Sequence, residues 1–147
     1  MEVKYNDSTH NRPWGERPVD APIVPIDIHA YTQQLMEEEA WQKNDRNAIT
    51  VFKSEGITVT IIALHKGAEM KPGNVEGTGI MTLQVVDGHV SFRTEQEMLD
   101  LHRGQIAALH EHIPYSATAL EDSICLLTMV RTASQKSGNN DVPSAVH

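Results

Sequence analysis

The sequence predicts an all-β fold, a sandwich or barrel of short strands, and three observations carry that prediction. About seven short segments are rich in apolar and β-branched residues, as expected for strands. Turn residues interrupt the chain about every eight to twelve residues, which is typical of antiparallel sheets. Only one segment repeats its apolar residues at helical spacing.

The 147-residue length fits one domain with a core of its own. Residues 1–24 contain three prolines and no periodicity, so we expect an extended or disordered arm there. Residues 25–133 are predicted to form the barrel. Residues 134–147 are equally unpatterned and are expected to be a disordered tail.

One short N-terminal helix is predicted at the start of the barrel domain. Ile28, Tyr31, Leu35 and Met36 recur at helical spacing, and the acidic run Glu37–Glu39 would form a solvated face. After this run the helical spacing of apolar residues ends, and segments with the composition of strands begin.

The predicted strands follow one another to the end of the domain. Ile57–Leu64 alternates at first and then becomes wholly apolar, which indicates a strand covered on both faces. Asp87-Gly88 between apolar runs is a strong hairpin signal, because glycine adopts positive φ without steric cost. The expected strands are Ile49–Phe52, Ile57–Leu64, Ile80–Val86, His89–Arg93, Gln105–Leu109, Ser116–Leu120 and Ile124–Val130.

The composition excludes several classes of function. A formal net charge of −8 argues against binding to nucleic acid or to an anionic membrane surface, both of which need clustered basic residues. No apolar stretch is long enough to span a membrane, and the N-terminus lacks the apolar core of a signal peptide. Cys125 is the single cysteine and lies in an apolar run, so we expect a buried, unreactive thiol in a cytoplasmic protein.

Glycine and proline recur at informative positions in the second half of the chain. Gly104 opens a segment in which Pro114 directly precedes Tyr115, and Gly88 closes the predicted hairpin upstream. These positions resemble the two sequence motifs of the cupin family, over roughly residues 57 to 130. The resemblance implies a jelly-roll barrel (double-stranded β-helix) and places the family's glutamate position at Met81.

The resemblance also implies a metal site whose usual ligands are missing. The family's histidine pair falls at Val75 and Gly77, or one register away at Asn74 and Glu76, and its third histidine position holds Tyr115. A divalent metal needs several converging imidazole and carboxylate donors. No cofactor is therefore predicted at the family's own metal position.

The same positions suggest a pocket for a small organic molecule. Met81 and Leu83 share a strand face, so that part of the barrel interior would be apolar. The resemblance aims Tyr115 into the barrel mouth, where a phenol can orient a polar ligand; the alternative is core packing with its hydroxyl bonded to a backbone carbonyl. The predicted pocket residues are Tyr115, Met81, Leu83, Met70, Glu76 and His112.

Three functional hypotheses follow. The first is a cupin-like protein that binds a small organic ligand without metal catalysis, or serves only as a stable β-barrel module. The second is a metal-dependent dioxygenase or isomerase with a shifted site at His110, His112 and Glu76, against the simpler interpretation of a histidine-rich surface turn. The third is structural: the N-terminal arm or the sheet edges would join two copies into a homodimer.

Overall fold

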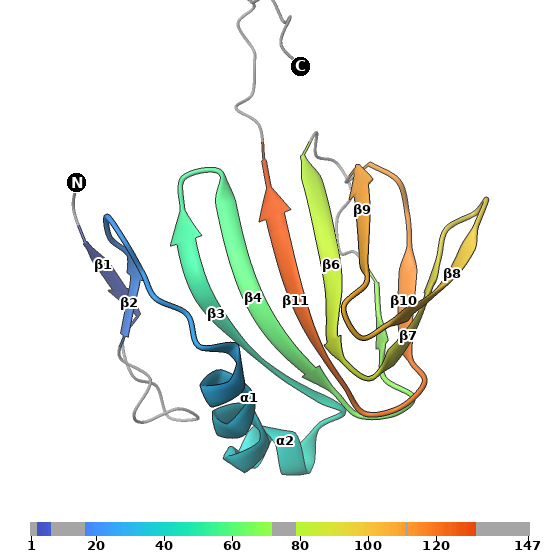
Figure 1. Cartoon of the computed structure of the whole chain (residues 1–147), viewed down its shortest axis with the longest axis horizontal. Coiled ribbons are helices and arrows are strands. Elements are labelled where there is room, and N and C mark those ends of the chain that lie inside the picture. Colours follow the sequence, from blue (N-terminus) through green and yellow to red (C-terminus); the bar gives the residue numbers. More distant parts are fainter. Residues whose placement is uncertain (1–2, 7–16, 72–78, 111, 132–147) are drawn as a thin grey trace, which may run out of the picture.

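The computed structural model describes residues 3–6, 17–71, 79–110 and 112–131, and they form an antiparallel β-sandwich with helices on one side (Figure 1). In chain order the elements are β1 (Lys4–Asn6), β2 (Arg17–Asp20), α1 (Ile28–Glu37), α2 (Glu39–Lys43), β3 (Arg46–Ser54), β4 (Ile57–Leu64), β5 (Glu69–Met70), β6 (Ile80–Asp87), β7 (His89–Arg93), β8 (Met98–His102), β9 (Ile106–His110), β10 (Ser116–Ala119) and β11 (Ser123–Val130).

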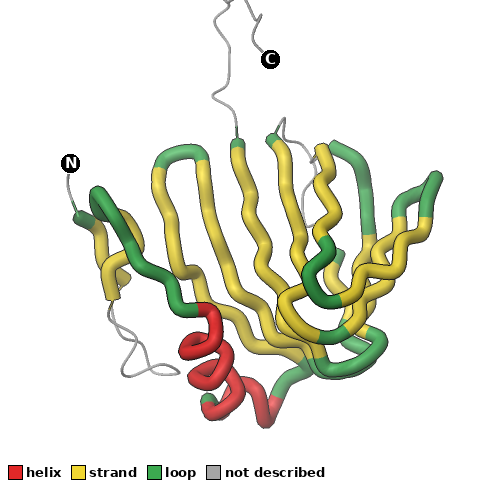
Figure 2. Tube along the Cα trace, in the orientation of Figure 1, coloured by secondary structure: helices red, strands yellow, loops and turns green. Residues whose placement is uncertain are grey.

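Two sheets make the sandwich, and strands distant in sequence lie side by side within each. The five-stranded sheet has the order β3-β4-β11-β6-β9, and the four-stranded sheet has the order β5-β10-β7-β8. All their pairings are antiparallel. Figure 2 shows how strands dominate the described chain. The prediction of an all-β jelly roll is confirmed.

The large sheet separates two hydrophobic cores. The inner core fills the space between the two sheets and includes Met81, Leu83 and Val85 of β6. The outer core lies where α1 and α2 cover the other face of the sheet, and it includes Leu35 and Trp41. Because successive strand residues point to opposite faces, one strand can serve both cores.

Strand β4 is the clearest example of this double burial. Ile61 and Ala63 belong to the outer core, while Ile62 and Leu64 belong to the inner core. All four side chains are buried, whereas the preceding residues of the strand are half-buried. The prediction of a strand covered on both faces is confirmed, and its cause is the change from alternating to continuous apolar sequence.

The prediction of one short helix is corrected to two. Glu38 has an extended backbone (φ −79°, ψ 151°) and separates α1 from α2. Its carboxylate accepts hydrogen bonds from the side-chain amides of Asn47 (3.0 Å) and Gln34 (2.9 Å), and the Asn47 amide also donates to the Leu35 carbonyl (2.9 Å). The middle of the acidic run is therefore a hydrogen-bonding partner of β3 and not a solvated helix face.

Four strands were not predicted: β1, β2, β5 and β8. Strand β8 is exposed along its length except at Leu101, so it has no apolar alternation to reveal it. Strands β1 and β2 pair within the predicted arm, and the Arg17 guanidinium donates to the Thr50 carbonyl of β3. The predicted tail, residues 134–147, lies outside the described residues.

Within the described ranges, no helix is long and apolar enough to cross a membrane. Cys125 is free and buried in the inner core. Burial raises the pKa of its thiol from 9.0 to about 12. A neutral thiol among apolar side chains is a packing group, as the sequence predicted.

We expect this thiol to make the folded state less stable in alkali. Above pH 9 the unfolded chain releases the thiol proton while the folded chain retains it until about pH 12, so stability is lost as pH rises through this range. Urea unfolding should show a loss of about 2 kcal/mol between pH 8 and pH 10.5 that is missing from the Cys125→Ala variant. Parallel pH profiles for the two proteins would contradict it.

Candidate functional site

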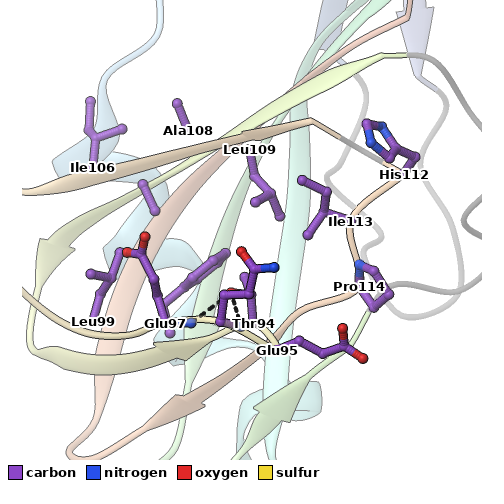
Figure 3. Close-up of a pocket in the computed structure, with 13 residues that line it drawn as sticks. Thr94, Glu95, Glu97, Leu99, Ile106, Ala108, Leu109, His112, Ile113 and Pro114 are labelled. Atoms are coloured by element: carbon purple, nitrogen blue, oxygen red, sulfur yellow. Dashed lines mark hydrogen bonds between the residues drawn. The ribbon is translucent and has the colours of Figure 1, made fainter.

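A cleft of about 590 Å³ opens where the edge of β9 faces the β7–β8 hairpin (Figure 3). β9 ends the five-stranded sheet and β8 ends the four-stranded sheet, so among the described residues each of these strands has a partner on one side only. The cleft therefore lies along an open side of the sandwich. Its lining residues are Phe92, Thr94, Glu95, Gln96, Glu97, Leu99, Ile106, Ala107, Ala108, Leu109, His112, Ile113 and Pro114.

Apolar side chains of the inner core reach into this cleft. Phe92 and Ala107 are buried members of that core and also line the cleft. The Tyr115 ring stacks on the Phe92 ring, with centroids 5.1 Å apart and an interplanar angle of 8°. Leu109 and Ile113 project toward the cleft from β9 and from the segment after it (Figure 3). The cleft thus has a packed apolar wall.

The turn of the β7–β8 hairpin supplies most of the polar lining. The backbone N–H groups of Gln96 and Glu97 both donate to Thr94 Oγ1 at 3.2 Å, and the Thr94 N–H donates to the Glu97 carbonyl at 2.8 Å. These bonds satisfy the turn internally and fix its backbone. The side chains of Glu95, Gln96 and Glu97 are exposed and remain available to a ligand.

The predicted pocket residues divide into three groups. Met70, Met81 and Leu83 are buried together in the inner core, and Tyr115 packs against it half-buried. Among the described residues of the prediction, only His112 lines the cleft. Glu76 lies outside the described residues. The structure thus brings Met70, Met81, Leu83 and Tyr115 together in or against the inner core, and none of these four lines the cleft.

The Thr94–Glu97 turn and Ile113 line the cleft although the sequence does not predict them as site residues. A polar turn between two strands is usually a solvated connection, so Thr-Glu-Gln-Glu gave no functional signal. Ile113-Pro114 is an apolar pair in a polar turn. Such a pair indicates that the turn lies against an apolar surface, and it is the one sequence feature here that points to the cleft.

The two described residues at the family's metal position, Met81 and Tyr115, are not ligands that fit a divalent metal. Met81 contributes a buried thioether and Tyr115 a half-buried phenol, and neither supplies the imidazole or carboxylate donors that such a metal needs. The His110 and His112 rings lie 6.0 Å apart between centroids, tilted by 45°. In the described ranges, no group of three or more possible metal ligands gathers. A shifted site that includes Glu76 stays a prediction.

Solved structures with the same architecture support the fold. A conserved protein of unknown function from Streptococcus pyogenes, SPY1581, is 22% identical with a TM-score of 0.59, and the match covers 79% of this chain and 93% of that one. A cupin superfamily protein from Desulfitobacterium hafniense is 11% identical with a TM-score of 0.55, covering 60% of this chain and 80% of that one.

An enzyme also shares the architecture. A mutant of salicylate 1,2-dioxygenase from Pseudoaminobacter salicylatoxidans is 17% identical with a TM-score of 0.62, and the match covers 76% of this chain but 36% of that one. Neither a family profile nor a curated protein matches the sequence. At these identities the similarities show the fold alone.

Proposed function

We propose that this chain, whose fold is that of the cupins, binds a small organic molecule in the cleft between β9 and the β7–β8 hairpin. The observation that carries the proposal is the cleft itself. Its volume of about 590 Å³ is in the range of small-molecule sites, which combine apolar walls with a few polar groups. An apolar ligand body would lie against Phe92, Leu109 and Ile113.

In this cleft the ligand would lie outside the interior position that the sequence predicts. Met81 and Leu83 are 2% and 0% exposed, so side chains already fill the space between the sheets at that level. The polar groups at the cleft rim, Gln96 and His112, can donate or accept hydrogen bonds and would orient the ligand. No catalytic step follows from this arrangement.

Binding of an uncharged probe tests the proposal. In ¹⁵N-labelled protein, 2-phenylethanol should shift the backbone resonances of Phe92, Leu109 and Ile113 in a saturable titration. The Ile113→Trp variant should weaken this binding at least about tenfold, because the larger side chain occupies the cleft.

Leu120→Trp is the matched control, since Leu120 is also an aliphatic residue of a connecting segment but does not line the cleft. It should bind 2-phenylethanol like the unsubstituted protein. Shifts scattered over the outer core, or equal binding by both tryptophan variants, would reject the cleft as the binding site.

A further inference from the structure

We infer that the natural ligand of the cleft is an organic cation, an amine or guanidine attached to an apolar body. This inference rests on the proposed function, because it concerns the ligand of the same cleft. It is carried by the sign of the charges that line the cleft, by the absence of described partners for those charges, and by their position on the hairpin side of the cleft.

The charges of the cleft have one sign. Its lining includes the carboxylates of Glu95 and Glu97 and, within the part of the chain that the structure describes, no lysine or arginine. Arg93, on the neighbouring strand β7, directs its guanidinium toward the Met98 sulfur (3.7 Å) and does not line the cleft. His112 is the remaining titratable lining residue, and its ring can accept a hydrogen bond from an ammonium group.

The two carboxylates have no partners in the described part of the protein. Among those residues, neither Glu95 nor Glu97 makes a side-chain hydrogen bond or ion pair. Other acidic groups do: Asp45 pairs with Arg46 (2.9 Å) and Glu39 pairs with Lys43 (2.6 Å). The turn needs neither carboxylate for its own stability, because Thr94 satisfies the backbone N–H groups of Gln96 and Glu97.

The position of these carboxylates suits an amphipathic cation. Both glutamates lie on the hairpin side of the cleft, where the Glu97 carboxylate points toward Ile106 and the Glu95 carboxylate lies below Pro114 (Figure 3). A ligand could place its apolar body against the wall and its cationic group at the turn. An anionic ligand, such as an aromatic carboxylate, would bring its charge toward these two carboxylates and be repelled.

Three probes of one shape separate the effect of charge from that of the apolar body. These are 2-phenylethylammonium, 2-phenylethanol and phenylacetate, titrated into ¹⁵N-labelled protein in low salt. The ammonium should bind about tenfold more tightly than the alcohol, and the carboxylate about tenfold more weakly. The preference should fall in about 1 M salt, because salt screens partly exposed charges.

The double variant Glu95→Gln/Glu97→Gln should bind all three probes with nearly equal affinity. Because the whole chain is acidic, Glu55→Gln/Glu121→Gln is the control: it removes the same charge at exposed positions outside the cleft and should keep the preference for the ammonium.

The outcomes distinguish the two proposals. Equal binding of the three probes by the unsubstituted protein, tighter binding of phenylacetate, or an equal loss of preference in both double variants would overturn the cationic ligand and leave the proposed function standing. Binding of none of the probes in the cleft would overturn both.

Discussion

Replacing Gly88 with alanine should destabilise the protein by about 3 kcal/mol or more. Gly88 has φ +107°, a conformation that L side chains rarely adopt. An added Cβ would also lie 2.3 Å from Ser123 Oγ and 2.7 Å from the Asp122 carbonyl oxygen. The turn between β6 and β7 would have to move away from the start of β11, and β11 is paired with both β4 and β6.

Gly67→Ala separates the two causes of this loss. Gly67 has a similar φ of +93°, but an added Cβ there would meet no atom within 4 Å. Its alanine variant should lose only about 1–2 kcal/mol, the cost of a left-handed residue with a side chain. Urea unfolding of both variants gives the comparison. If both variants lose the same free energy of unfolding, the close approach of the added Cβ to Ser123 does not contribute to the loss.

The Met81→Glu variant should lose about 3–5 kcal/mol at neutral pH, although it restores the acidic residue of the motif that the sequence resembles. Met81 is 2% exposed and packs among apolar side chains of the inner core. A carboxylate there would have no described cationic partner, and burial would raise its pKa. The deficit should therefore shrink as pH falls and the carboxyl group becomes protonated.

Met81→Leu is the control for size, since this exchange conserves volume and should cost less than about 1.5 kcal/mol. Urea unfolding at pH 7 and at pH 4.5 measures both variants. A Met81→Glu variant as stable as the leucine variant at pH 7 would mean that water or a cation reaches this position.

The strands that the sequence predicted are those that bury one or both faces. On β6, Met81, Leu83 and Val85 alternate with half-buried residues, and on β4 the continuous apolar run reflects two cores. β8 escaped prediction because its stability comes from backbone pairing with β7 and not from its mostly exposed side chains. The extended Glu38 escaped because its partner, Asn47, lies on another element.

The candidate site was less predictable than the fold. Motif resemblance located Tyr115 and Met81 near one another, but whether such residues line a cavity depends on how their neighbours pack, and the Phe92 ring lies against Tyr115. The cleft lies between a hairpin turn and the segment after β9, and the distance between them is set by the stacking of two sheets. Local sequence patterns contain no information on how two sheets stack.

The division of the large sheet into two cores has a consequence for how such a protein can change over evolution. Residues of β4, β6 and β11 that face the helices hold the outer core, while the residues between them face the sandwich interior. Apolar substitutions that conserve volume on the interior side can therefore accumulate while the helix-facing residues of each strand keep the sheet in place. Because the five-stranded sheet has a hydrophobic core on each face, one face can diverge in sequence while the other holds the sheet together. One architecture can then host unrelated binding chemistries.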